Sequence, residues 1–148
     1  MKRLASIGML VFMPCASAAW TAVGQSQDGS AYFIDLEHID QRQDGTVRVW
    51  TKWEYTKQQP ISGANKFSDD PHFYLSMRGY NEYDCKERRV RALDLTLFTE
   101  RDLAGQSITA TADRNTPGVP HYDPGWEFAA PDTVGWLTLD AVCPKKNK

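Results

Sequence analysis

Two segments of the chain alternate regularly between apolar and polar side chains, and this pattern commits much of the molecule to antiparallel sheet. Residues 46–55 (TVRVWTKWEY) place valine, threonine and aromatic side chains on one face and Trp50 with the charged side chains on the other. Residues 74–85 (YLSMRGYNEYDC) alternate in the same way, with Cys85 on their more apolar face. A period of two is typical of a strand that buries one face. We therefore expect two antiparallel strands, each with a core face and a polar face.

Four further segments are predicted to extend this sheet. Residues 20–24 and 31–36 are expected to form a first hairpin, because the Gln-Asp-Gly-Ser stretch between them is typical of a turn. Residues 88–98 form the next strand, and residues 105–111 form a last short one.

The strand predicted at 88–98 changes phase along its length. Leu93, Leu95 and Leu97 share one face, whereas Val90 is out of phase with them. A β-bulge near Arg91 would bring both parts onto the core face.

The C-terminal segment changes from a period of two to helical spacing. Trp136, Leu139 and Val142 recur on one helix face, and Asp132 or Thr133 is a suitable N-cap. Strands followed by one helix predict an α+β fold. We expect an antiparallel sheet of about five or six strands with one C-terminal helix on one face.

Two segments rich in proline, glycine and aspartate are predicted to be loops, at residues 57–71 and 113–131. Trp126 in the second loop is expected to pack beneath the helix or on the edge of the sheet. A chain of 148 residues has room for one domain, which we place at residues 20–144, followed by a basic tail at 145–148.

The N-terminus has the pattern of a secretory signal peptide, predicted at residues 1–19. Lys2 and Arg3 precede a short apolar run, and small residues at 16–19 suit a cleavage site. The apolar run is too short to span a bilayer comfortably, and no second one follows, so we expect no membrane span in the mature chain. Pro14 makes Cys15 a poor lipidation site, and we assign Cys15 to the removed peptide. A lipoprotein acylated at Cys15 is the alternative.

Of the three cysteines, Cys85 and Cys143 then remain in an exported chain. Two cysteines in an oxidising compartment predict one disulfide. Cys85 lies on the apolar side of its strand and Cys143 on the apolar side of the helix, so the bond would tie the helix to the sheet. A pair of free thiols is disfavoured outside the cytoplasm. A metal site is disfavoured because the two cysteines are not closely spaced and no histidines cluster nearby.

The sequence shows no motif for catalysis. It lacks a phosphate-binding glycine loop, a paired-histidine zinc motif and a nucleophile elbow. His38, His72 and His121 are far apart in the chain and are interpreted as surface histidines. The net charge of −2 argues against a nucleic-acid partner. We therefore expect a protein that is not an enzyme and has no catalytic residues, metal or cofactor.

The polar face of the predicted sheet is the strongest candidate for function. Cations and large aromatic side chains mixed on one surface suit recognition of a protein or an acidic polymer. A solvated face, with arginine and lysine stems covering the rings, is the plainer alternative, and a homodimer that buries Trp50 is a third. The candidate partner-binding residues are Arg48, Trp50, Lys52, Arg78, Tyr80, Lys86, Arg88, Arg89 and Arg91.

Several short motifs make residues 20–144 similar to the surface-adhesin protein E family of Gram-negative bacteria. They are Tyr32-Phe33-Ile34-Asp35 with Ile39, Val47-Val49-Trp50, Tyr83-Asp84-Cys85 before a basic strand, and Pro131-Asp132-Thr133 running to Val142-Cys143. The resemblance implies an antiparallel sheet with a C-terminal helix tethered by a disulfide. It also implies an adhesin that binds host extracellular-matrix and serum proteins, forms dimers and binds haem.

The adhesive region of the family resembles residues 78–101 of this chain, with Arg78, Tyr80, Lys86, Arg88, Arg89 and Arg91 as candidates. The family's named member is lipidated, whereas this chain lacks a convincing lipidation site, so we expect either the periplasm or the cell surface. The first hypothesis is an exported binding protein. A periplasmic module that binds a haem-like ligand through Tyr and His side chains is the second, and an exported enzyme inhibitor or small enzyme is the third.

Overall fold

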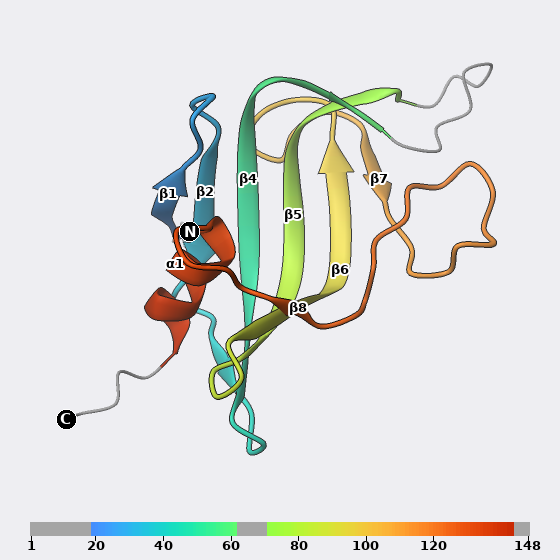
Figure 1. Cartoon of the computed structure of the whole chain (residues 1–148). Helices are drawn as coiled ribbons and strands as arrows, with labels where there is room; N and C mark the ends of the chain where they lie inside the picture. Colours follow the sequence, from blue (N-terminus) through green and yellow to red (C-terminus); the bar gives the residue numbers. More distant parts are fainter. Residues whose placement is uncertain (1–18, 62–70, 144–148) are drawn as a thin grey trace, which may run out of the picture.

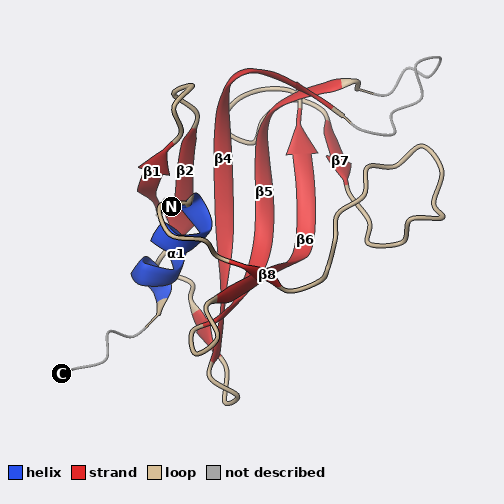
Figure 2. Ribbon diagram, in the orientation of Figure 1, coloured by secondary structure: helices blue, strands red, loops and turns tan. Residues whose placement is uncertain are grey.

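The computed structural model describes residues 19–61 and 71–143, which form an antiparallel sheet with one helix on one face (Figure 1, Figure 2). The helix is α1 (Val134–Val142). This confirms the predicted fold class. The described strands are β1 (Trp20–Gln25), β2 (Ala31–Asp35), β3 (Asp40–Gln41), β4 (Thr46–Pro60), β5 (Phe73–Asp84), β6 (Arg89–Phe98), β7 (Ser107–Thr109) and β8 (Glu127–Phe128).

Six strands lie side by side in the order β1-β2-β4-β5-β6-β7, and all the pairings between them are antiparallel. β3 pairs with β4 and β8 pairs with β6, which brings the described strands to eight. The predicted five or six strands match the main path and omit β3 and β8. Strands of two residues are too short to show an alternating pattern.

Register keeps the two faces of the sheet chemically different. β4 and β5 pair Val47 with Tyr83 on the apolar side and Trp50 with Tyr80 on the polar side. α1 lies against the apolar side and contacts β1 (Figure 1). The buried residues of this core are Tyr32, Ile34, Val47, Val49, Tyr83, Ala129, Leu139 and Val142.

A disulfide joins Cys85, at the end of β5, to Cys143, at the end of α1, across 58 positions of sequence. The Cα atoms of the two cysteines are 5.6 Å apart, within the usual range for a bond of this kind. Both cysteines pack against the core. The predicted pairing and its role in tethering the helix are therefore confirmed.

Thr133 begins the helix, as one of the two predicted N-caps. Its backbone is extended, as is usual for an N-cap. Its Oγ1 accepts a hydrogen bond from the backbone N–H of Trp136 at 3.3 Å, which satisfies one of the free donors of the first turn. Asp132, the other candidate, has a φ of 62° and lies outside the helix.

The structure refines three details of the predicted strands and loops. β4 continues to Pro60 and β5 begins at Phe73, so the ends of the predicted 57–71 loop are partly strand; residues 62–70 lie outside the described ranges. The bulge predicted near Arg91 is at Leu93, between the Tyr80–Asp94 and Asn81–Ala92 pairs, two residues along β6. β8 interrupts the predicted 113–131 loop.

Residues 1–18 and 144–148 are outside the described part of the chain, so the signal peptide, the question of Cys15 and the basic tail stay predictions. No helix within the described ranges has the length and apolar character needed to cross a membrane.

Candidate binding face of the sheet

The face of the sheet opposite α1 is called the open face, and it carries most of the predicted binding residues. Cross-strand partners share a face, and the pairs Arg48–Glu82, Trp50–Tyr80 and Lys52–Arg78 place these side chains together. β6 adds Arg91 opposite Glu82 and Arg89 opposite Asp84, and β2 adds Phe33 opposite Lys52. The open face is therefore defined by Trp20, Phe33, Arg48, Trp50, Lys52, Arg78, Tyr80, Glu82, Asp84, Arg89 and Arg91.

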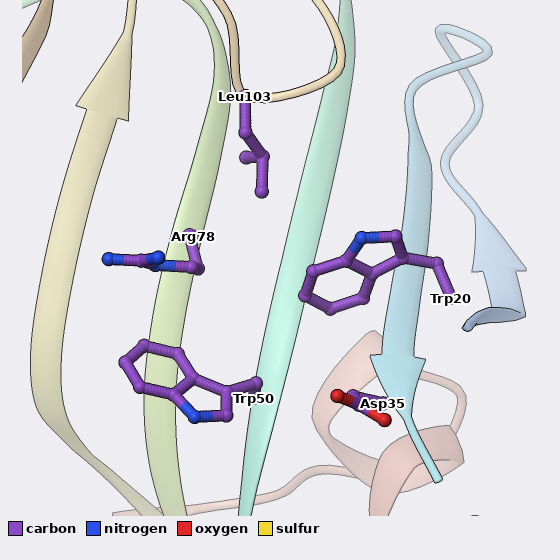
Figure 3. A pocket seen from close by; sticks show the side chains of 5 residues that line it. All are labelled: Trp20, Asp35, Trp50, Arg78 and Leu103. Carbon is purple, nitrogen blue, oxygen red and sulfur yellow. The ribbon is translucent and has the colours of Figure 1, made fainter. Parts of the chain in front are cut away.

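Trp50 and its two neighbours on β5 form the centre of the open face. The ring centroids of Trp50 and Tyr80 are 4.7 Å apart, and the guanidinium carbon of Arg78 lies 4.7 Å from the centroid of Trp50. Figure 3 shows Trp50 and Arg78 beside each other across β5. Such contacts fix the side chains in place before any partner binds, because each packs on the next.

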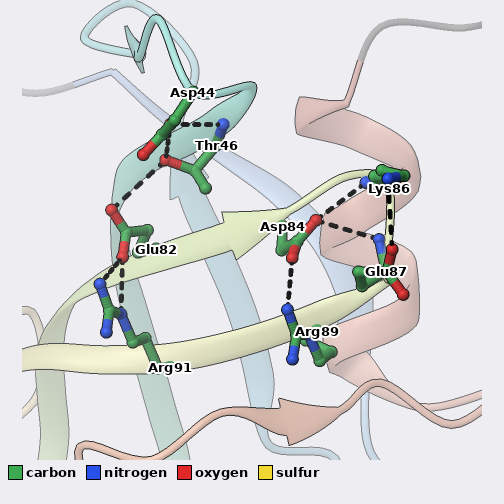
Figure 4. A network of polar contacts seen from close by, with 8 residues as sticks. All are labelled: Asp44, Thr46, Glu82, Asp84, Lys86, Glu87, Arg89 and Arg91. Carbon is green, nitrogen blue, oxygen red and sulfur yellow. Dashed lines mark hydrogen bonds and ion pairs between the residues drawn. The ribbon is translucent and has the colours of Figure 1, made fainter.

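Glu82 is a buried carboxylate on the same face, and two arginines bind it. Arg48 Nε donates to Glu82 Oε1 at 2.8 Å, and Arg91 Nε donates to Oε2 at 2.6 Å. The Glu82 side chain is only 2% exposed. Figure 4 shows Glu82 with Arg91 beside it. Burial on its own would raise the pKa of Glu82, but the hydrogen bonds and charges of Arg48 and Arg91 outweigh burial and lower the pKa.

Asp84 and Trp126 hold the arginines of β6. Arg89 Nη2 donates to Asp84 Oδ2 at 2.7 Å, and this hydrogen bond is the main reason that the pKa of Asp84 is lowered (Figure 4). The ring of Trp126 lies beneath both arginines, with its centroid 5.2 Å from the guanidinium carbon of Arg89 and 4.5 Å from that of Arg91. Trp126 thus packs at the β6 edge, one of its two predicted positions.

Lys52 is on the open face but is buried, with 6% of the residue exposed. Its Nζ lies 3.0 Å from Asp102 Oδ1 and 3.2 Å from Glu54 Oε1. The same ammonium is 4.7 Å from the ring centroid of Phe33. Because its charge is enclosed by these groups, Lys52 supports the face from within and does not reach its surface.

A hollow of about 310 Å³ lies on the open face between β2, β4 and β5 (Figure 3). Its lining residues are Trp20, Asp35, Trp50, Arg78 and Leu103. The side chain of Asp35 is buried, and its two oxygens already accept from the backbone N–H of Glu37 at 3.1 Å and contact His38 Nδ1 at 2.8 Å. The hollow therefore has apolar walls, an engaged carboxylate and one guanidinium.

Two predicted binding residues lie away from the open face. Lys86 is in the turn between β5 and β6, and its side chain is 88% exposed. Arg88, in the same turn, lies against the helix: its guanidinium carbon is 3.5 Å from the ring centroid of Trp136, and its Nη2 donates to Asp140 Oδ1 at 2.9 Å. A role in partner binding stays a prediction for both.

Sequence reasoning found the residues on the two long alternating strands and missed those delivered by neighbouring elements. Trp20 and Phe33 are on predicted strands, and the register of β2 against β4 was the missing information. Leu103 and Asp102 come from a turn with positive φ values, which has no repeating pattern in sequence. Trp126 comes from a proline-rich segment, where periodicity gives no signal.

The three histidines lie on different elements. His38 follows β2, His72 precedes β5, and His121 forms an isolated parallel bridge with Thr111. In residues 19–61 and 71–143, no three histidine, cysteine or acidic side chains are arranged to hold a metal ion. Haem binding through histidine and tyrosine stays a hypothesis.

Comparison with known proteins places this architecture, an antiparallel sheet with a helix tethered by a disulfide, in a recognised class. The sequence description of the family "Surface-adhesin protein E" matches residues 20–144. The chain belongs to the surface-adhesin protein E family. Comparison with curated protein sequences gives no match.

Solved structures of Haemophilus influenzae protein E have a similar fold. Crystal form II superposes with a TM-score of 0.55 at 16% identity, covering 76% of this chain and 79% of that one. Protein E from non-typeable Haemophilus influenzae superposes with a TM-score of 0.57 at 14% identity, covering 90% of this chain and 81% of that one. At these identities the likeness concerns the fold.

Proposed function

We propose that this chain is an exported, non-catalytic binding protein that docks a protein partner, such as a host matrix or serum protein, on the open face of its sheet. The predicted signal peptide at 1–19 supports export to the periplasm or cell surface. Membership of the surface-adhesin protein E family supports a partner on the host side.

The observation that carries the proposal is that, in the described part of the chain, the helix covers one face of the sheet and leaves the other without a helix. The disulfide and the core hold α1 on one face, and among the described elements no helix covers the other. The open face then presents Trp50 in contact with both Tyr80 and Arg78. Tryptophan, tyrosine and arginine are the residue types that dominate binding energy at protein interfaces.

The described contacts divide the open face into a centre and a supporting rim. Arg48, Arg91 and Arg89 are paired with Glu82 or Asp84, and they orient the surface and set its charge. Trp50, Tyr80 and Arg78 supply the contact area at the centre. Because these rings are already packed, little side-chain entropy is lost when a partner binds.

A binding assay with immobilised matrix and serum proteins tests the proposal. The exported chain, purified in its oxidised form, is expected to bind at least one of them, and Trp50→Ala and Tyr80→Ala are each expected to weaken that binding about tenfold or more. Phe73→Ala is the matched control, because Phe73 is an exposed aromatic residue on the opposite side of β5. Equal loss in the control, or no binding to any protein in the panel, contradicts the proposal.

Ionic strength and self-association are tested alongside. The arginine side chains of the open face predict that binding to an acidic partner weakens as salt rises. Sedimentation of the wild-type chain and of Trp50→Ala distinguishes a homodimer from a heterologous partner. A wild-type dimer that Trp50→Ala dissociates would assign the open face to self-association instead.

A further inference from the structure

Arg78 differs from the other cations of the open face because no carboxylate in the described residues pairs with it. Arg48 and Arg91 are bound to Glu82, Arg89 to Asp84, and Lys52 to Glu54 and Asp102. Asp94, which pairs with Tyr80 across β5 and β6, forms no ion pair with Arg78. Among the described residues, carboxylates of the protein thus pair with the other cations of the open face and leave Arg78 without a carboxylate.

The surroundings of Arg78 hold its guanidinium ready for an anion. Its guanidinium carbon lies 4.7 Å from the centroid of Trp50, and its Nε is buried without a hydrogen-bond partner. The Nε atoms of Arg88 and Arg89 are buried and unpartnered in the same way, and a ligand cannot reach a buried Nε, so its contacts would be with the two Nη groups of Arg78. A planar guanidinium stacked on a ring matches a carboxylate, which can accept two parallel hydrogen bonds from it.

The hollow beside Arg78 limits what can carry that carboxylate. Trp20, Trp50 and Leu103 give it apolar walls, and the oxygens of Asp35 are already engaged by Glu37 and His38. Arg78 is the cation of the lining, so an anionic group of a ligand would lie on the Arg78 side of the hollow, away from the carboxylate of Asp35. An apolar stem ending in a carboxylate fits both the walls and the guanidinium.

We propose that the Arg78–Trp50 hollow is the anchoring subsite of the open face and takes an acidic side chain of a protein partner. The proposal rests on the proposed function, because the open face must be where a partner docks. It adds the chemistry of recognition: the carboxylate is held by Arg78, and the methylene stem lies against Trp20 and Trp50.

Blocked tripeptides test whether the subsite recognises a carboxylate, and they do so before the protein partner has been identified. Acetyl-Ala-Glu-Ala-amide is titrated into the ¹⁵N-labelled chain, and the indole N–H signals of Trp20 and Trp50 and the Nε–H signal of Arg78 are followed. The glutamate peptide is expected to shift these three signals. The glutamine peptide, of equal size and no charge, is expected to bind about tenfold more weakly, because the charge-assisted hydrogen bonds are lost. Equal binding of the two peptides overturns the proposal.

A third peptide separates the two sources of a carboxylate. Acetyl-Ala-Ala-Ala, which has a free C-terminal carboxylate and no acidic side chain, is expected to bind more weakly than the glutamate peptide. Tighter binding of this peptide overturns the assignment to an acidic side chain. The indole signals of Trp53 and Trp136, which pack on the helix side, serve as an internal reference that is expected not to move.

Variants locate the effect at Arg78. Arg78→Gln is expected to abolish the preference for glutamate over glutamine, and Asp94→Asn to strengthen glutamate binding by removing a neighbouring negative charge. Arg114→Gln is the matched control, because it removes an exposed arginine from the 113–125 segment. An unchanged preference in Arg78→Gln, with the Trp53 signal showing an intact fold, overturns the proposal.

The failure of the subsite and the failure of the proposed function give different results. If matrix or serum proteins bind wild type and Arg78→Gln equally but bind Trp50→Ala weakly, the subsite is wrong and the open face still docks the partner. If the glutamate peptide binds at Arg78 while no matrix or serum protein binds, the carboxylate chemistry is supported and the proposed host partner is wrong.

Discussion

The guanidinium carbon of Arg88 lies 3.5 Å from the ring centroid of Trp136, so the turn between β5 and β6 is held directly against α1. Arg88 also donates to Asp140 on the same helix at 2.9 Å. The disulfide from Cys85 enters the helix end from the same turn. A cation–ring contact, an ion pair and a covalent bond therefore fix this helix on the face opposite the open face.

Arg88→Ala is expected to lower the free energy of unfolding by about 1 kcal/mol, because its contacts are with the helix. Urea denaturation followed by far-ultraviolet circular dichroism measures the stability, and the immobilised-partner assay measures binding. Lys86→Ala in the same turn is the control, because its side chain is 88% exposed. Weaker partner binding without loss of stability would mean that Arg88 serves the partner and that its contacts with the helix contribute little.

Replacement of both cysteines, Cys85→Ser with Cys143→Ser, is expected to lower the free energy of unfolding by about 4 kcal/mol, the chain-entropy value for a loop of 58 positions. The loss arises because the unfolded chain regains freedom that the bond removed. Denaturant midpoints of the oxidised wild type and the double variant measure it. An unchanged midpoint would mean that the bond contributes little to holding the helix.

The ion pairs of Glu82 are expected to make the free energy of unfolding fall in acid. Its pKa in the folded chain is lowered by Arg48 and Arg91 against the opposing effect of burial, so it lies below the ordinary value of 4.5. The carboxylate therefore stabilises the fold fully above that ordinary value, and its contribution falls as pH drops through the folded pKa.

Glu82→Gln is expected to lose about 2 kcal/mol or more at neutral pH, because two guanidiniums lose their buried partner. As the pH is lowered below about 5, the free energy of unfolding of Glu82→Gln is expected to fall less than that of wild type, because the variant has no carboxylate to protonate at this position. Denaturation midpoints at a series of pH values measure both effects. Glu127→Gln, at an exposed position on β8, is the control, and identical acid limbs in wild type and Glu82→Gln would contradict the account.

The predicted signal peptide has a direct chemical test. Mass spectrometry of the exported chain is expected to give a mature N-terminus at Ala19 or Trp20, because small residues precede this point. A chain that begins with a modified Cys15 would instead be a lipoprotein held at a membrane. That result would change its location without changing the fold of residues 20–144.

The sequence predicted those parts of the fold that repeat. Alternation located β4, β5 and β6, and independent placement of Cys85 and Cys143 on apolar sides predicted the bond between sheet and helix. The bulge in β6 was expected near Arg91 from the phase of Val90 and lies at Leu93, because alternation shows that a residue is inserted but not which one.

The candidate site was harder to predict because it depends on pairing between distant segments. Alternation places Arg48, Lys52 and Arg78 on the polar side of their strands, but it does not say which acidic groups face them. The ion pairs with Glu82 and Asp102 depend on register and on a turn, and they separate a neutralised cation from one left without a carboxylate. Three-dimensional contacts, and no pattern along the chain, distinguish Arg78 from the rest.

Oxidative footprinting of the chain with and without its bound partner tests most directly whether the open face is the docking surface. Each face carries its own aromatic reporters: Trp50 and Tyr80 on the open face, Trp136 on the helix. Binding is expected to reduce oxidation of Trp50 and Tyr80 several-fold and to leave Trp136 unchanged. Protection of Trp136 with undiminished oxidation of Trp50 would place the partner on the helix and contradict the account.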